Sequence, residues 1–552
     1  MSASSKKKLR KEQNAAMLTE RQQQEQKEAK KLKRNTILFV IIIGLVVGAA
    51  LFTMAAGAFT RSGIVEKMTV AATVGDEKLN AVEFSYYFND AIMEQYSSWN
   101  ESYGDYTTMY MQMYGLDLTQ SLDAQVYDEE TGKTWADYFV DMALANAQSD
   151  HALYEAAMKA GYELSEDEQA SLDSMESNIS LYASLYGYSS GNSYLRASYG
   201  NGASVKTYAE YTRKATIASS YQAKYVADLT YEDTDLRAYE ADKMANFNSY
   251  DFVTYYLNYT DYREGGTKDD EGNVTYSDEE NEAAKAAAKA AAESLLTATT
   301  AEELDAAIVA LTEDESKAST HNHDVLYSSV STTYRDWVAD AERKEGDITM
   351  IANESTTTDE DGKETTVVNG YYVILFEGSN DNAEPMSNVR HILFQFEGGT
   401  EDDSGNTTYS DEEKAAAKKE ADDLLAKWKE GDATEESFIA LVKDNTDDTG
   451  SAETGGLYEN INPASSYVEN FLNWAIDDER KAGDTGVVET EYGYHVMYYV
   501  GDSETTYRDY MIENELRSSD AETWYNGLIE AVSATLGNTS KLNKDIVLAA
   551  ES

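Results

Sequence analysis

One segment of the sequence occurs twice, and this repeat constrains the fold more than any other feature. Residues 264–280 read EGGTKDDEGNVTYSDEE, and residues 397–413 read EGGTEDDSGNTTYSDEE. The spacing between the copies is too long for a solenoid repeat and matches the size of a small domain. The sequence therefore indicates either a duplicated domain or an acidic loop copied alone.

The similarity extends well beyond this segment on both sides. Upstream, FVTYYLNY at 252–259 faces NVRHILFQF at 388–396, and both have the apolar and aromatic content of strands. Downstream, NGYYVILFEGSN at 369–380 faces YGYHVMYYVGDS at 492–503. A duplicated domain built of strands and helices is therefore the better interpretation.

The repeated segments have a predicted structural role. Ser277 precedes Glu280 by three residues and Ser410 precedes Glu413 in the same way, which is the pattern of a capping box at a helix start. The Gly-Gly pair upstream, with its Asp and Asn neighbours, is typical of a solvated flap. The repeat alone is thus weak support for chemistry.

The charge balance of the chain narrows the classes of molecule that it can bind. The chain has 45 Lys and Arg against 101 Asp and Glu, a formal net charge of −56. Nucleic acid is not expected as a partner, because its binding depends on cations that neutralise phosphates. The chain has no cysteine, which excludes disulfides, thiolate metal sites and a cysteine nucleophile.

The N-terminal segment differs from the rest. Residues 1–35 form a basic arm, and an uncharged apolar run follows from Ile37 to Phe59. Such a run can cross a bilayer core of about 30 Å as a helix, and the basic arm favours a cytoplasmic N-terminus. A cleaved signal peptide is the alternative to an uncleaved single-pass anchor at 36–59. Either way, we expect residues 62–552 to work outside the cytoplasmic membrane, on a Gram-positive cell surface.

Residues 70–248 are predicted to be helical. Trp135, Phe139 and Ala143 recur at helical spacing, and Ser165 begins a further capping-box pattern, SEDE. The segment YTTMYMQMYG is rich in tyrosine and methionine. It is either helix-packing surface or an adaptable apolar surface that accepts many partners.

Four segments of the second copy, residues 386–503, occur in an informative order. They are VRHIL, FIALVKDNTDDTGSAETGGL, YVENFLNWAID and GYHVMYYV. In this order they resemble a parvulin-type peptidyl-prolyl isomerase domain over its full length. The resemblance implies a four-stranded antiparallel sheet surrounded by helices, with two histidines close together at its centre.

The resemblance also implies the site residues, position by position. The implied catalytic set is His391, Asp448 and His495. The implied apolar pocket for the proline ring consists of Leu457, Tyr467, Phe471 and Ile476. No metal and no cofactor are expected.

Prolyl isomerisation suits such residues. Rotation about an X–Pro bond faces a barrier of about 18–20 kcal/mol, because the amide has partial double-bond character. No bond is broken, so an apolar pocket with weakly polar neighbours can favour the twisted amide. Two roles stay open for the histidine pair: it orients the site and holds the core, or it takes part directly.

The first copy, residues 249–380, is interpreted as a parvulin-like domain that has lost isomerase activity. Both histidines and a Gly-Gly turn are replaced in the alignment. The matched positions are Tyr255 for His391, Tyr372 for His495, and Asp324-Val325 for Gly455-Gly456.

The regions around the two copies resemble PrsA- and SurA-type foldases. EAAMKAGYELSEDEQ resembles their N-terminal chaperone region, and residues 504–535 resemble the helix that returns to complete it, followed by a tail at 536–552. The predicted fold class is therefore α+β. It comprises one transmembrane helix, a helical chaperone region and two parvulin-like domains.

The sequence thus predicts a membrane-anchored extracytoplasmic foldase. It would isomerise X–Pro bonds and bind unfolded or nascent secreted proteins, and a homodimer is compatible with this activity. The acidic flap at 397–413 would repel a phosphorylated substrate. The alternative is a non-catalytic chaperone or surface scaffold in which both parvulin-like domains are structural.

Overall fold

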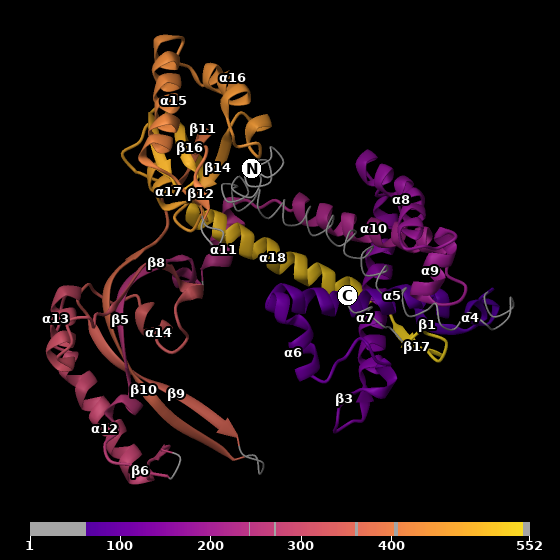
Figure 1. Cartoon of the computed structure of the whole chain (residues 1–552), viewed down its shortest axis with the longest axis horizontal. Helices are drawn as coiled ribbons and strands as arrows, with labels where there is room; N and C mark the ends of the chain where they lie inside the picture. Colours follow the sequence, from indigo (N-terminus) through magenta and orange to yellow (C-terminus); the bar gives the residue numbers. More distant parts are fainter. Residues whose placement is uncertain (1–61, 242, 270–271, 359–362, 402–406, 545–552) are drawn as a thin grey trace. The chain divides into compact units, whose positions relative to one another are not determined.

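The computed structural model describes residues 62–544 except 242, 270–271, 359–362 and 402–406. The chain divides into two compact units. Within the described part, a helical unit comprises residues 62–230 and 517–544, and a sheet unit comprises residues 231–516. Figure 1 shows the elements of both units in sequence colours.

The helical unit is built around long capped helices. Capping boxes are present at the starts of α5, α7 and α8, and the one at Ser165 confirms the sequence prediction. Its core contains Phe84, Phe88 and Phe139, all fully buried. The helices are α4 (Ile64–Met68), α5 (Ala81–Tyr103), α6 (Thr107–Met113), α7 (Trp135–Ala160), α8 (Glu166–Leu185), α9 (Gly191–Tyr199), α10 (Val205–Asp228) and the C-terminal part of α18 (Tyr507–Glu530).

A small antiparallel sheet completes the helical unit. Its order is β17-β1-β2, so β1 pairs with its sequence neighbour on one side and with the far end of the chain on the other. The strands are β1 (Val70–Val74), β2 (Glu77–Asn80) and β17 (Ala534–Leu536), and a separate two-stranded pair is β3 (Val126–Asp128) with β4 (Lys133–Thr134).

The predicted fold class was wrong in including a transmembrane helix. Among residues 62–544 with the gaps given above, no helix is both long enough and apolar enough to cross a membrane. The basic arm at 1–35 and the predicted span at 36–59 lie outside the described residues. The prediction for 70–248 also omitted β1 and β2, which are only five and four residues long. The structure is a mixed α and β fold.

The sheet unit contains two four-stranded antiparallel sheets, one in each copy of the repeat. Their orders, β8-β5-β10-β9 and β14-β11-β16-β15, are the same arrangement. The first-copy elements are β5 (Ser249–Asn258), β6 (Thr267–Lys268), β7 (Val274–Thr275), α12 (Asp278–Leu295), α13 (Ala301–Thr312), β8 (Thr320–Leu326), α14 (Arg335–Val338), β9 (Ile348–Thr358) and β10 (Glu364–Asn380).

The second copy repeats this order with shorter outer strands. Its elements are β11 (Pro385–Gln395), β12 (Thr400–Glu401), β13 (Thr407–Thr408), α15 (Asp411–Glu430), α16 (Glu435–Asn445), β14 (Leu457–Ile461), α17 (Glu469–Ala475), β15 (Thr485–Thr490) and β16 (Gly493–Thr506). The short helix α11 (Asp233–Glu240) precedes the first copy, and α18 follows the second. Figure 1 shows the difference clearly, because β9 and β10 form a long hairpin in the first copy only.

The repeated segment forms a small hairpin tied to a helix start. In each copy two short strands pair, β6 with β7 and β12 with β13. The capping boxes at Ser277 and Ser410 are confirmed. The capping glutamates have a second role: Glu280 accepts the Gly266 N–H and Glu413 accepts the Gly399 N–H, each at 2.9 Å. One carboxylate thus caps the helix and holds the flap.

A second set of contacts is also repeated. Arg343 donates from Nε to the Trp337 carbonyl, and Arg480 donates in the same way to the Trp474 carbonyl. Each guanidinium lies over its tryptophan ring, at 4.1 Å and 4.0 Å from the ring centroid. Two copies with the same strand order, caps and arginine contacts support duplication of a whole domain.

Candidate active site

A line of buried polar side chains crosses the second-copy sheet. His391 on β11 and His495 on β16 approach through their Nδ1 atoms, 3.1 Å apart. His391 Nε2 lies 2.9 Å from Asp448 Oδ2, and His495 Nε2 lies 3.0 Å from Thr490 Oγ1. Both histidines and Asp448 have no exposed surface. The structure therefore brings together all three residues of the predicted catalytic set, beneath the surface.

One arrangement of protons satisfies the hydrogen bonds along this line with both imidazoles neutral. Asp448 is an acceptor when ionised, so His391 donates from Nε2 and presents an unprotonated Nδ1. His495 must then donate from Nδ1, which leaves its Nε2 to accept from Thr490. Thr490 in turn accepts the Tyr492 backbone N–H at 3.2 Å. Each donor meets an acceptor when both imidazoles are neutral.

Burial and hydrogen bonding set the pKa values at this site. Burial alone would raise the pKa of Asp448, but hydrogen bonds and charge from His391, with hydrogen bonds from Ser451 and Tyr458, lower it to about 2. Burial and repulsion from His391 hold the pKa of His495 well below its usual range. At ordinary pH the site therefore contains an ionised Asp448 carboxylate and a neutral His495.

An aromatic layer covers the histidine pair. The Phe471 ring lies edge-on to His391 at 5.4 Å and close to His495 at 5.3 Å. Tyr467 lies 5.3 Å from Phe471 and stacks on Tyr458 at 5.4 Å. Of the four predicted pocket residues, Tyr467, Phe471 and Ile476 belong to this cluster.

Leu457, the fourth predicted pocket residue, lies outside that cluster. Its strand neighbour Tyr458 is in the cluster and donates its hydroxyl to Asp448 at 2.9 Å. Successive side chains on a strand point to opposite faces, so only one of the two can reach the histidines. Leu457 pairs with Arg390, on the face that carries the Arg390–Glu435 ion pair. Its pocket role stays a prediction.

The sequence patterns do not indicate Tyr458, Ser451 or Thr490 as site residues. Ser451 is fully buried and donates its hydroxyl to Asp448, and Thr490 ends the polar line. Each is a common residue type with no spacing signal of its own. Only the sheet register and the turn after α16 bring them to the histidines.

A glycine turn holds the first strand in place. Gly456 has φ +70° and accepts the His391 N–H at 3.0 Å. A Cβ at Gly456 would lie 2.3 Å from the His391 carbonyl oxygen, which is too close for any side chain. Gly456 therefore allows the backbone approach that positions His391.

The described residues of the first copy contain no such polar line, and two of the sequence matches to this copy need correction. In the sheet register, Ile374 and Met497 occupy matching positions and pair with Thr254 and His391, so Thr254 matches His391. The first copy has four extra residues before the flap, at Tyr259–Tyr262, where the sequence match allowed for three, so the match to Tyr255 was wrong by one position. The same register confirms Tyr372 as the match to His495.

The second correction concerns the Gly-Gly turn. Thr254 pairs with Thr320, so Ser319-Thr320 takes the place of Gly455-Gly456. Asp324 instead matches Asn460: both have positive φ, and both donate their N–H to a side-chain oxygen on the neighbouring strand. The match to Asp324-Val325 was wrong because Asp324 lies at the bulge that both copies share and not at the turn before it.

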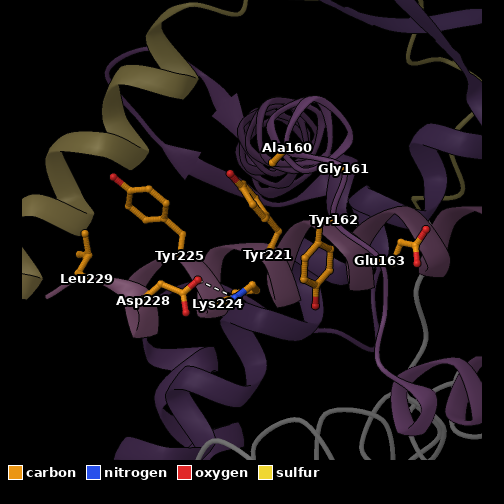
Figure 2. A pocket seen from close by; sticks show the side chains of 9 residues that line it. All are labelled: Ala160, Gly161, Tyr162, Glu163, Tyr221, Lys224, Tyr225, Asp228 and Leu229. Carbon is orange, nitrogen blue, oxygen red and sulfur yellow. Dashed lines mark hydrogen bonds and ion pairs between the residues drawn. The ribbon is translucent and has the colours of Figure 1, made fainter.

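The helical unit contains a separate hollow, far in sequence from the histidines. It has a volume of about 500 Å³ and lies beside α10 and the turn after α7 (Figure 2). Tyr162, Tyr221 and Tyr225 line it, with the ion pair between Lys224 and Asp228 at 2.6 Å. Such a lining suits binding of an apolar group more than acid–base chemistry.

Comparison with known proteins identifies the second copy. Residues 371–501 match the family model of the PPIC-type PPIASE domain. This range begins within β10 of the first copy and covers all of the polar line and the aromatic layer. No curated protein sequence matches the chain.

Three solved structures of peptidylprolyl isomerases are similar to the chain. PrsA from Bacillus anthracis is 20% identical over 27% of this chain and 59% of its own, with a TM-score of 0.17. PrsA from Bacillus cereus is 22% identical over 27% and 50%, with a TM-score of 0.17. PrsA from Bacillus subtilis is 12% identical over 75% and 92%, with a TM-score of 0.23.

The chain thus spans 59% and 50% of the length of the first two structures. The family assignment rests on the domain match together with the site geometry. Residues 371–501 carry a parvulin-type peptidyl-prolyl cis/trans isomerase domain of the PPIC class.

Proposed function

We propose that the protein is a foldase whose second copy isomerises X–Pro bonds in unfolded polypeptides. The carrying observation is the buried line from Asp448 through His391 and His495 to Thr490, directly under the Phe471 ring. This line fixes the position of the aromatic layer, and the layer offers an apolar binding surface for a proline ring. An enzyme can bind the twisted amide more tightly than the planar amide only if such a surface is precisely positioned.

The burial of the histidines favours a positioning role for them. Because neither histidine ring has exposed surface and Phe471 is only 2% exposed, a bound peptide meets the partly exposed Tyr467 and Ile476 before it meets a histidine. We therefore assign His391, His495 and Asp448 as positioning residues and the aromatic layer as the peptide-binding surface.

The helical unit supplies the second half of the proposal. It would hold unfolded chains while the second copy acts on their prolyl bonds. Exposed methionine and tyrosine side chains on this unit support such a role. We further propose that the protein works outside the cytoplasmic membrane, in keeping with its lack of cysteine and its acidic composition.

The test is the refolding rate of a small protein that is limited by prolyl isomerisation. The full-length protein should accelerate this rate at catalytic concentration, and a variant with His391→Ala and His495→Ala should lose most of the acceleration. Circular dichroism of the variant checks that the fold survives. No acceleration by the wild-type protein would reject the isomerase proposal.

A binding-only chaperone is the second candidate, and the first copy favours it. That copy keeps the aromatic residues Tyr334 and Tyr372 in contact, at 5.3 Å, without the polar line. If the full chain suppresses aggregation of an unfolded protein but leaves its proline-limited rate unchanged, this candidate replaces the first.

A further inference from the structure

The helical unit has an exposed apolar surface around α6, which we call the α6 surface. Large apolar side chains are normally scattered singly over a soluble protein, whereas a contiguous group marks an interaction site. On this surface six such side chains are 45–66% exposed. They are Tyr106, Met109, Met113, Tyr114, Val126 and Tyr127.

These side chains are linked to one another along α6 and through the rings beneath them. Met109 and Met113 lie one turn apart on α6, so they share a face. Ring contacts then lead from Tyr114 through the indoles of Trp99 and Trp135 to Tyr127, at 5.5, 6.2 and 4.8 Å between centroids. A separate stacked pair, Tyr103 and Tyr110 at 3.9 Å, lies on the same helices.

The α6 surface lies in a segment whose own residues carry only negative charge, and the cations that the structure places against it, Lys133 on the paired strand β4 and Lys544, are each bound to an aspartate. Between Lys78 and Lys133 the sequence has no lysine or arginine and ten aspartates and glutamates. Among them, Glu101, Asp105 and Glu129 are exposed in the same stretch as the apolar side chains. A bound segment that carries positive charge next to apolar groups would therefore be favoured, and an acidic one would be repelled.

The composition of the surface indicates a partner without a fixed shape. Methionine side chains are flexible and polarisable, so they re-pack around different apolar groups. Tyrosine adds apolar area with a polar tip. The hollow of Figure 2 differs in that its lining includes a cation, Lys224, paired with Asp228 beside Glu163.

We infer that the α6 surface is where the protein binds unfolded polypeptide segments, and that it selects segments in which large apolar residues lie next to lysine or arginine. The inference rests on the holding role given above under Proposed function and specifies its substrate class. It also accounts for the segment YTTMYMQMYG, whose residues the core of the helical unit only partly uses: Met111 is buried, while Met109 and Met113 are exposed.

The test uses the full-length protein and three fluorescein-labelled peptides of twelve residues without proline. One alternates leucine or phenylalanine with lysine, the second has glutamate for lysine, and the third has serine for the apolar residues. Binding is followed by fluorescence anisotropy. The test variant carries Met109→Ser, Met113→Ser and Tyr114→Ser. The matched control carries Leu181→Ser and Leu185→Ser on α8, whose side chains are 57% and 68% exposed.

The lysine peptide should bind at least about tenfold more tightly than either other peptide, and its affinity should fall with added salt. The test variant should weaken its binding about tenfold, while the α8 control should change it by less than about twofold. Equal losses in both variants, or equal binding of lysine and glutamate peptides, would overturn the inference. Self-association of the wild type through Met109 and Met113, seen by light scattering, would also overturn it.

The isomerase proposal is tested separately in the same samples. The test variant should isomerise a short X–Pro peptide at the wild-type rate, because its three changes lie outside the second copy. Absence of binding in the wild-type protein would reject the holding role itself. Normal binding in the test variant would reject only the assignment to the α6 surface.

Discussion

The two copies of the duplicated domain share a framework and differ in one layer. Both have the same strand order, the same glutamate between flap and helix, and the same arginine over tryptophan. Within the part of both copies that the structure describes, only the second has a buried carboxylate–histidine–histidine line. At the matched positions of the first copy stand Thr254 and Tyr372. The comparison separates the residues that make the fold from those that support chemistry.

The difference also shows what the buried line does for its surroundings. In the second copy, Phe471 rests on two histidine rings. In the first copy the matching Tyr334 contacts Tyr372 and Phe252. Both copies therefore have an aromatic layer. It packs on histidine rings in the second copy and on other aromatic rings in the first. The predictions below test this contrast, from the largest effect to the smallest.

Removing the carboxylate should have the largest effect. Asp448→Ala leaves the donors of His391, Ser451 and Tyr458 without an acceptor in a buried site, and it should lower the free energy of unfolding by about 3–5 kcal/mol. Thr254→Ala, at the first-copy position of His391, should cost about 1 kcal/mol. Urea unfolding of both variants measures this, and similar losses would show that the buried line adds no stability.

Adding a side chain at the glycine turn should have the second-largest effect on stability. Gly456→Ala places a Cβ against the His391 carbonyl at positive φ, and it should cost about 1–3 kcal/mol. Thr320→Ala, the matching change in the first copy, should stay within about 0.5 kcal/mol. Thermal unfolding compares the two, and a neutral Gly456→Ala would contradict the close backbone approach.

Acid should weaken the second copy before the first. The folded-state pKa of His495 lies well below 6.5, so the unfolded chain takes up a proton below about pH 6.5 while the folded chain does not. Stability is therefore present above pH 6.5 and is lost as pH falls, by up to about 1.4 kcal/mol per pH unit.

Hydrogen exchange of the full-length protein can follow this loss strand by strand. After correction for intrinsic rates, peptides from β16 should lose protection between pH 7 and pH 5 more steeply than those from β10. The variant His495→Gln should reduce the difference. If protection in β10 and β16 fell equally with pH, the proposed effect of His495 titration on the second copy would be contradicted.

The smallest effect should be equal in the two copies. Glu280→Ala and Glu413→Ala each remove a helix cap and the flap contact, so each should increase exchange at the start of its own helix to a similar extent. Neither change should alter the isomerase rate, because both glutamates lie outside the polar line. Loss of activity in Glu413→Ala alone would give the flap a functional role.

The features that could be predicted from the sequence were local ones. Capping boxes at Ser277 and Ser410 depend on a three-residue spacing, and the structure confirms them. Similarity to the family placed His391 and His495 on two neighbouring strands, which the register then brings together. Long, periodic helices such as α7 were also readable.

The features that were missed depend on distant pairing. The strand β17 is three residues long and pairs with β1 from the opposite end of the chain, so no local pattern reveals it. Tyr458 and Leu457 are adjacent, and only the sheet register decides which one faces the histidines. The match of Tyr255 to His391 failed because an insertion before the flap shifts the alignment, and only hydrogen-bond pairing fixes such a shift.

The central claim is that prolyl isomerisation resides in the second copy alone. Exchange spectroscopy on a short peptide with one X–Pro bond measures it most directly, with the full-length wild type, Phe471→Ala and Tyr334→Ala at equal concentration. We expect Phe471→Ala to lower kcat/KM by at least about tenfold, which corresponds to about 1.4 kcal/mol, and Tyr334→Ala to leave it within about twofold. Equal losses in the two variants, or a loss in Tyr334→Ala alone, would contradict the account.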